Sequence, residues 1–450
     1  MGIKHRPRPP EQADLLRPRL VDIIDGRHEL VRLAALIDWD WLEREWAGFF
    51  PAQEGRPAIN PRLVAGLMVL QHTYGLSDEA VLARWVENPY FQHFTGETFF
   101  QHRLPIHPSS LSRWRGRIGE EGVEWLLTKT IEAGRACGAV TPRGLAEIAV
   151  DTTVMEKAIA HPTDSRLNER ARRSLVTLAQ KAGITLRQNY NRLAPRLAAQ
   201  AGRHAHARQF RRMRKALRTL KGYTGRVLRD LGRKLDAVPE EGLRTRIEQH
   251  MALVTRLLRQ TPKSTGKIYA LHEPEVDCIS KGKARVRYEF GCKVSIATTL
   301  AGGFVVGMRS MPGNPYDGHT LPDALQQVET LTGSCPSLAV VDRGYRGHGA
   351  HGTTVLVSGT RRGLTPRLRK LLRRRSAIEP EIGHMKTEGR LARCALKGTI
   401  GDALYAVLCG CGHNIRKILV YLKALLLALL TSLIHAIARP DHLPVAAHAA

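Results

Sequence analysis

A short apolar run that ends on a carboxylate, Leu338–Asp342, constrains the possible folds of this chain more than any other segment. Apolar residues in succession are typical of a strand that is buried on both faces of a sheet. An Asp at the carboxyl end of such a strand lies where open α/β sheets bind their ligands. Asp342 can also be interpreted as a cap of the element that follows, and this stretch alone leaves both interpretations open.

A second acidic residue lies within a strand pattern far upstream. Gly144–Met155 is rich in β-branched residues around Asp151 and has no helical period, which predicts a central strand with Asp151 in its middle. Gly302-Gly303 predicts the turn of a β-hairpin. The strands predicted downstream are Lys267–Leu271, Val286–Phe290, Lys293–Ala297, Phe304–Met308, Leu338–Asp342 and Thr353–Val357.

Helical patterns accompany these strands, one at Thr320–Leu331 and one around residue 379. The order of strands and helices predicts an α/β fold, in which helices pack on a mixed sheet. We assign this domain to residues 141–160 and 265–416.

Residues 1–140 contain short predicted helices joined by tight turns. Asn60-Pro61, Ser77 and Pro108 are typical helix starts, and Gly75 is a typical helix end. Three arginines lie in the last of these helices: Arg113, Arg115 and Arg117. The pattern favours a helical N-terminal DNA-binding domain of the helix-turn-helix type. A helical bundle that does not contact DNA gives the same periodicity and is the alternative.

The chain carries a large excess of positive charge. Lys and Arg total 69 against 41 Asp and Glu, which gives a formal net charge of +28 in 450 residues. This excess predicts a polyanionic partner, most often nucleic acid, because neutralising phosphates releases counterions. A basic ribosome-associated or membrane-associated protein is the alternative.

More than half of the net charge lies in one segment. Residues 161–262 contain 24 Lys and Arg but only 7 Asp and Glu, within long helical patterns. We therefore predict a basic helical insertion over residues 161–264 that lies along a phosphate backbone. A solvated helical face would have a similar composition. The densest basic patch is Arg211, Arg212, Arg214 and Lys215.

The cysteines and the two ends of the chain indicate the compartment. Seven scattered cysteines argue against a disulfide framework and for a reducing environment. The N-terminus lacks the apolar segment of a signal peptide. Residues 417–450 include an apolar stretch, Lys423–Ala438, that is too short for a membrane span and predicts a buried or oligomerisation helix. We expect a cytoplasmic protein.

A third acidic candidate lies on the last predicted helix. Arg375, Glu379 and Lys386 share one face of that helix, whereas Glu381 is rotated by about 200° from Glu379 and should face elsewhere. Glu379 and the two strand-borne Asp residues would repel one another unless a cation lay between them. Oxygen ligands favour Mg²⁺ or Mn²⁺, and a pair of such ions suits in-line attack on a phosphodiester.

The acidic motifs resemble those of a known family. Asp151 in AVDTTV, Asp342 in VVDRGYRG and Glu379 in RSAIEPEIGHMK resemble the catalytic triad of DDE transposases with an RNase H-like core. More closely, residues 20–417 resemble bacterial transposases of the insertion-sequence-five family. The supporting matches are His161–Ser165, Lys281–Lys283, Tyr288–Phe290, Gly313–Thr320 and Leu396–Asp402 through Asn414.

One position departs from the family signature. That signature often has Tyr three residues before the Arg, and Leu372 occupies the position here. The change would loosen a packing or DNA contact but would remove no metal ligand.

The resemblance implies a metal-dependent DNA transposase. Metal-activated water would cleave double-stranded DNA at terminal inverted repeats, and the freed 3′-hydroxyl would attack target DNA. Arg375 and Lys386 would hold phosphate near the helix. Arg343 and Arg346 could do the same near Asp342, or they could have only the structural role that is common for surface arginines. A homodimer or larger assembly at the bacterial nucleoid is expected, because two DNA ends must be brought together.

Two other functions compete with this interpretation. A non-catalytic DNA-binding regulator would bind DNA without cleaving it, and a nuclease of the same fold would cleave DNA without joining strands.

Overall fold

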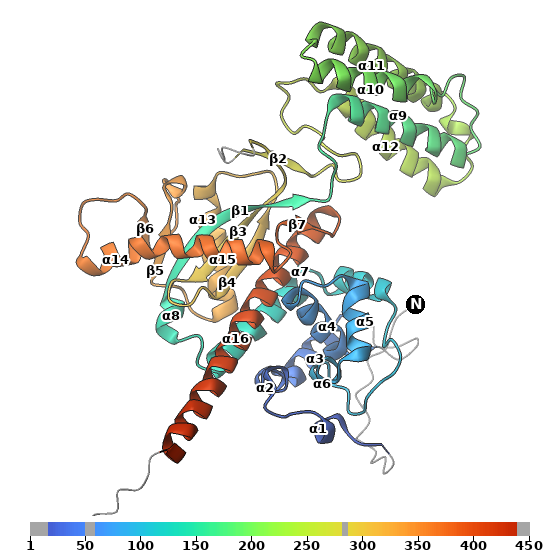
Figure 1. The fold of residues 1–450 in the computed structure, drawn as a ribbon. Coiled ribbons are helices and arrows are strands. Elements are labelled where there is room, and N and C mark those ends of the chain that lie inside the picture. Colours follow the sequence, from blue (N-terminus) through green and yellow to red (C-terminus); the bar gives the residue numbers. More distant parts are fainter. Residues whose placement is uncertain (1–16, 50–58, 281–286, 439–450) are drawn as a thin grey trace, which may run out of the picture.

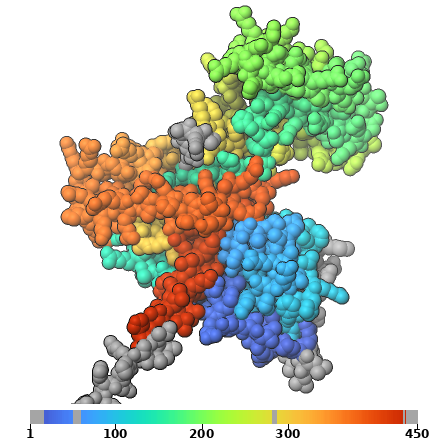
Figure 2. All heavy atoms as spheres, in the orientation of Figure 1, coloured from blue at the N-terminus to red at the C-terminus, as the bar shows by residue number. Residues whose placement is uncertain are grey.

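The computed structural model describes residues 17–49, 59–280 and 287–438. Figure 1 shows a central sheet with helices packed on it, helical N-terminal segments beside it, and a bundle of helices that is set apart from both. The space-filling view in Figure 2 shows this bundle as a lobe of its own. The long helix α16 (Gly398–Ala438) runs between the sheet and the N-terminal helices and contacts both.

Helices form the described N-terminal part, as the sequence predicts. The side-chain oxygens of Asn60 and Ser77 accept hydrogen bonds from the backbone N–H groups of Arg62 and Ala80, so both predicted helix starts are confirmed. Gly75, with a φ of 64°, follows the end of the first of these two helices. The helices are α1 (Leu20–Ile23), α2 (Glu29–Leu36), α3 (Trp39–Ala47), α4 (Pro61–Thr73), α5 (Asp78–Glu87), α6 (Pro89–Phe94), α7 (Pro108–Ala136) and α8 (Pro142–Ala146).

One mixed sheet forms the centre of the molecule. Its strands are β1 (Glu147–Lys157), β2 (Asp277–Ile279), β3 (Glu289–Thr299), β4 (Val305–Met311), β5 (Leu338–Val341), β6 (Thr354–Val357) and β7 (Arg393–Cys394). The order is β2-β3-β1-β5-β6, with β4 paired to β3 and β7 paired to β1. β1, β3 and β4 are antiparallel neighbours, whereas β1, β5 and β6 run parallel. The predicted hairpin and the central strand with Asp151 are therefore confirmed.

Helices cover both faces of the sheet. Those that follow β4 are α13 (Asp317–Thr332), α14 (Pro366–Arg374) and α15 (Ile378–Thr387), with the short 3₁₀ turns η2 (Arg343–Tyr345) and η3 (Arg375–Ala377). One hydrophobic core joins the N-terminal helices, the sheet and α16, and its buried members include Leu67, Leu127, Val305 and Leu408. A smaller core lies where α14 and α15 pack on β1, β5 and β6. The N-terminal helices are therefore packed as part of the body that carries the sheet.

The basic insertion is helical and has a core of its own. Its elements are α9 (Asp164–Lys181), α10 (Leu193–His206), α11 (Phe210–Gly232), η1 (Leu235–Ala237) and α12 (Glu241–Arg259). Leu175, Val227, Leu231 and Val254 are fully buried between α9, α11 and α12. Because this core is separate from that of the sheet, the insertion is a second hydrophobic unit within the chain.

Two of the predicted strands differ from the structure. Lys267–Leu271 is not a strand, because Ile268 is buried in the insertion core and its backbone N–H and C=O are both hydrogen-bonded by the side chain of Gln260. The side-chain amide thus replaces a neighbouring strand. In the segment Val286–Phe290, β3 begins only at Glu289, and Val286 lies outside the described residues.

The C-terminal apolar helix is only partly buried. α16 crosses the predicted boundary at residue 417 without a break, and most of its residues from Gly401 to Leu422 are buried, although Val420 is exposed. Leu427, Leu429 and Leu430 are exposed, so the interpretation as a buried helix is wrong for this end, while an oligomerisation role stays a prediction. Within the described residues, no helix is long and apolar enough to cross a lipid bilayer.

Lys157, at the end of β1, is a buried cation where the chain leaves the sheet for the insertion. Its side chain is 1% exposed, and Nζ lies 2.9 Å from Glu273 Oε2 and 2.8 Å from Asp402 Oδ1. Burial alone would lower the pKa of Lys157, but the two carboxylates outweigh this effect and raise the pKa. Glu273 follows the insertion and Asp402 lies in α16, so one ammonium group holds together three separate parts of the chain.

Replacing Lys157 by Met should destabilise the protein by roughly 3–5 kcal/mol, because two buried carboxylates would lose their counter-charge. Urea-induced unfolding followed by circular dichroism and tryptophan fluorescence measures this change. The matched control is Lys181→Met at the exposed end of α9, which should change the free energy of unfolding by less than about 0.5 kcal/mol. Equal stability of the two variants would contradict the role given to Lys157.

Candidate active site

The register of β1 against β5 brings the first two acidic candidates together. Ala149 is paired with Val340 in the parallel ladder, so continuing the register by two residues brings Asp342 beside Asp151. Asp342 directly follows β5, and its Oδ1 also accepts a hydrogen bond of 2.7 Å from the backbone N–H of Gly344. Both interpretations of Asp342 therefore apply, since it ends a strand and caps η2.

The third acidic candidate reaches the same place from a helix. Glu379 lies in the first turn of α15, together with Pro380, a residue that is tolerated in the first turn of a helix. The guanidinium of Arg375 joins all three carboxylates. Nη2 of Arg375 lies 3.1 Å from Asp151 Oδ2 and 3.9 Å from Asp342 Oδ2, and Nη1 lies 3.6 Å from Glu379 Oε1. The structure thus brings Asp151 close to Asp342, although the two residues are 191 positions apart in the sequence.

These contacts define the electrostatics of the site. One guanidinium offsets the repulsion among three carboxylates, and Glu379 is the most exposed of them, with 62% of its side chain accessible. Among the described residues, no three His, Cys, Asp or Glu side chains lie close enough together to hold a metal ion in this arrangement. The donor chemistry nevertheless fits a hard divalent cation, because the carboxylates supply only oxygen ligands.

A fourth carboxylate that the sequence reasoning did not select adjoins this site. Asp317, at the start of α13, accepts hydrogen bonds from Thr152 Oγ1 (3.1 Å) and Lys293 Nζ (2.9 Å). Thr152 follows Asp151 in β1, so Asp317 ties α13 to the strand that carries the site. The signal in the sequence was its place in the Gly313–Thr320 motif, which was used only for the resemblance.

Tyr345 is a buried tyrosine next to the acidic residues. It is the last residue of η2, which follows Asp342, and it is completely buried. Burial raises the pKa of Tyr345 well above its ordinary value, and the charges of Asp151, Asp317 and Asp342 raise it further. The phenol is therefore neutral at physiological pH.

Most of the basic residues predicted to contact DNA are accessible. Arg343 and Arg346 are exposed beside η2, and Lys386 is half-buried on α15. The patch Arg211, Arg212, Arg214 and Lys215 on α11 is exposed, and so are Arg113 and Arg117 on α7. Arg343, Arg346 and Lys386 lie on elements that also carry or adjoin an acidic candidate, whereas the patches on α11 and α7 lie on separate elements.

Arg115 is an exception, and the structure contradicts the prediction that it contacts DNA. Its residue is 3% exposed, and its guanidinium donates to both carboxylate oxygens of Asp78, at 2.9 and 2.6 Å, and to Gln71 Oε1 at 2.6 Å. Arg115 therefore joins α7 to α4 and α5 inside the N-terminal helices. Helical spacing alone could not distinguish it from its exposed neighbours.

A basic helix beside the acidic site was not selected from the sequence. α14 directly precedes η3 and its Arg375, and its basic residues are all exposed: Arg367, Arg369, Lys370, Arg373 and Arg374. The available signal was the dense run of Lys and Arg between residues 361 and 375. This helix places a strong positive field next to the carboxylates.

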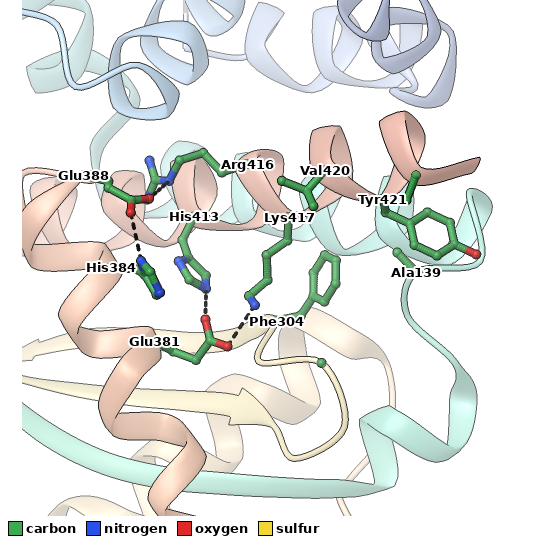
Figure 3. Close-up of a pocket in the computed structure, with 12 residues that line it drawn as sticks. Ala139, Phe304, Glu381, His384, Glu388, His413, Arg416, Lys417, Val420 and Tyr421 are labelled. Carbon is green, nitrogen blue, oxygen red and sulfur yellow. Dashed lines mark hydrogen bonds and ion pairs between the residues drawn. The ribbon is translucent and has the colours of Figure 1, made fainter. Parts of the chain in front are cut away.

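A cavity of about 470 Å³ lies behind α15, where this helix meets α16 (Figure 3). Glu381 points into it, away from Glu379, as predicted, and its carboxylate lies 3.1 Å from His413 Nε2 and 2.9 Å from Lys417 Nζ. Burial raises the pKa of Glu381, but the hydrogen bonds from His413 and Lys417 outweigh burial and lower it. Burial lowers the pKa of His413, and Glu381 only partly opposes this effect. These contacts anchor α15, and with it Glu379, to α16.

Comparison with known proteins identifies the family to which this site belongs. Residues 18–117 match a family described as a transposase domain (DUF772), and residues 260–415 match a transposase DDE domain. The Rhizobium meliloti protein named "Uncharacterized protein ORF8 in nfe locus" is 52% identical over 197 residues, which are 44% of this chain and 95% of that protein. No solved structure matches the chain.

The chain belongs to the DDE transposases. It is a DNA transposase, an enzyme that depends on divalent metal to cleave DNA and transfer strands.

The protein should become less stable as the pH falls, because Glu381 and His413 both have lowered pKa values in the folded state. Ionised Glu381 has a lower pKa in the folded protein than its ordinary 4.5, so its contribution is complete above pH 4.5 and is lost as the pH falls through the folded value. The lowered pKa of His413 adds a loss that begins below pH 6.5.

Glu381→Gln should therefore be less stable than wild type at pH 7 by roughly 1–3 kcal/mol, and the difference should shrink below pH 4.5. Urea midpoints at several pH values between 4 and 7.5 measure this. Glu329→Gln, at an exposed position of α13, is the control and should follow the wild type throughout. A difference that does not depend on pH would contradict the assignment.

Arg375→Gln should strengthen the binding of Mn²⁺ to the DNA-free protein by about tenfold, because the guanidinium competes with metal for the three carboxylates. Titration followed by electron paramagnetic resonance of free Mn²⁺ measures the affinity without any reaction. Arg374→Gln removes the same charge from the exposed end of α14 and should leave the affinity nearly unchanged. If the two variants bind Mn²⁺ equally well, the guanidinium does not compete with the metal.

Proposed function

We propose that Asp151, Asp342 and Glu379 are the catalytic carboxylates of this transposase and that they hold two divalent cations, Mg²⁺ or Mn²⁺. The observation that carries the proposal is their convergence on the single guanidinium of Arg375, at 3.1, 3.9 and 3.6 Å. Divalent ions bound there supply Lewis acidity at the scissile phosphate and lower the pKa of the attacking water.

The basic side chains around the carboxylates bind and orient the DNA. Arg375 exchanges its carboxylate partners for a phosphate when DNA arrives, since a guanidinium forms paired hydrogen bonds with either group. Lys386, on the same helix as Glu379, holds a neighbouring phosphate. Arg343 and Arg346, exposed beside Asp342, do the same on the other side of the site.

The sheet supports an RNase H-like core. In the order β4-β3-β1-β5-β6, three antiparallel strands are followed by two that run parallel to the central strand. An acidic residue in the central strand and another at the end of its parallel neighbour are the two carboxylates that such a core supplies. The third comes from α15, which packs on this sheet through Ile378 and Ile382.

Double-stranded DNA is contacted over several surfaces in this proposal. The exposed basic residues of α14 lie next to the carboxylates, the patch on α11 lies on the insertion, and Arg113 and Arg117 lie on the N-terminal helices. The DNA comprises the terminal inverted repeats of a mobile element of the insertion-sequence-five family and the target. Two such ends require a homodimer or a larger assembly.

Asp342→Asn should slow cleavage of DNA that carries the element ends by about 1,000-fold or more, because a metal ligand is lost while the charge distribution elsewhere is kept. Gel analysis of labelled DNA with Mg²⁺ or Mn²⁺ measures the rate, and a joining assay with target DNA tests strand transfer. Asp323→Asn, an exposed position on α13, is the matched control and should cleave like wild type.

Binding of the same DNA without metal should be unchanged in both variants. Equal cleavage by wild type and Asp342→Asn would exclude the assigned role, and cleavage without joining would assign a nuclease activity alone.

A further inference from the structure

A cleft of about 660 Å³ lies in the insertion, the bundle of helices that Figure 1 shows set apart from the sheet. It is formed by α9, α12 and the segment that follows α12, and its size is within the range of clefts that bind small molecules. Its lining includes three arginines, three leucines, Ser174 and His250. The transposase chemistry described above uses none of them.

The rim of this cleft is positively charged. Arg170 and Arg173 project from α9 and Arg246 from α12, and among the residues that the structure describes no Asp or Glu lines the cleft. Arg173 has a carboxylate partner, Glu169, at 3.6 Å, but within the described residues neither Arg170 nor Arg246 forms an ion pair. An excess of arginines on a concave surface attracts an anion, and the planar fork of each guanidinium suits phosphate.

The floor of the cleft is apolar and carries a hydrogen-bonding pair. Leu178, Leu253 and Leu271 are half-buried there, and they offer a surface on which a flat ring can lie. The hydroxyl of Ser174 is hydrogen-bonded to Nε2 of His250, which comes from the facing helix. A ligand that fits has a phosphate at one end, a flat apolar face at the other, and polar edges between them.

We propose that this cleft binds one nucleoside phosphate unit, with its phosphate among Arg170, Arg173 and Arg246 and its base on the leucine floor. A phosphate of a fully paired duplex would use only the rim, because its bases are stacked and cannot reach the leucines. The occupant is therefore an unpaired nucleotide of a DNA strand or a free nucleotide. The proposal goes beyond strand transfer and requires of the established activity only that the protein binds DNA.

The experiment compares the binding of fluorescein-labelled DNA by the full-length protein in fluorescence anisotropy without metal, so no catalysis is involved. The DNAs are a single strand, a duplex with one unpaired nucleotide, and the fully paired duplex. The cleft variant is Arg170→Gln with Arg246→Gln. The control is Arg196→Gln with Arg203→Gln, which removes equal charge from exposed positions of α10 outside the cleft.

The cleft variant should bind the single strand and the bulged duplex about tenfold more weakly than the control variant does, with little difference between the two on the paired duplex. Leu253→Ser should weaken the binding of unpaired DNA and spare the paired duplex. Leu193→Ser, at an exposed position of α10, is its control and should change neither.

Competition with deoxyadenosine monophosphate and with inorganic phosphate identifies the source of the nucleotide. Displacement of the labelled strand by micromolar nucleotide, but not by phosphate, supports the site and assigns a free nucleotide as its occupant. Retention of the strand against both competitors, together with the losses expected above, assigns an unpaired nucleotide of DNA. Equal losses for the cleft and control arginine variants would overturn the proposal, and so would equal losses on paired and unpaired DNA.

Discussion

Three carboxylates can lie side by side only if a positive group lies among them, and the arrangement around Arg375 depends on this constraint. Like charges at such distances repel by an amount that burial increases, and the guanidinium is the group that offsets this repulsion. Because the same fork also fits a phosphate, in the proposed function this single side chain would couple the charge state of the site to the arrival of DNA. The position of η3, between α14 and α15, is therefore central to that proposal.

The scaffold that holds this charge cluster is rigid for a specific reason. β1 is paired on both sides, antiparallel to β3 and parallel to β5, so Asp151 and Asp342 are fixed by the register of one ladder. Glu379 is held in place by ion pairs and not by strand pairing, since Glu381 on the same helix contacts His413 and Lys417 of α16. α16 in turn packs against the N-terminal helices, so the matched N-terminal transposase domain supports the site through shared core packing.

The insertion is stabilised separately from the sheet. It has its own hydrophobic core, and it is tied to the sheet through the buried cation of Lys157, which contacts Glu273 and Asp402. A separate core allows the insertion to carry an excess of surface arginines without perturbing the packing of the sheet. Its two basic features differ in shape, because the α11 patch is an exposed surface whereas the α9–α12 cleft is concave and has an apolar floor.

The sequence alone determined the features that depend on local pattern. These are the central strand with Asp151, the strand that ends at Asp342, the hairpin, the helical insertion and the approach of Arg375 to Glu379, since periodicity and turn residues act over a few positions. Arg375 itself lies in η3, just before the helix that carries Glu379. Only the tertiary structure decided which groups meet across the chain. It buried Arg115 against Asp78, placed Asp317 beside Thr152, and let Gln260 replace a strand neighbour of Ile268. Each of these outcomes depends on a partner distant in sequence or on burial, and no local pattern encodes either.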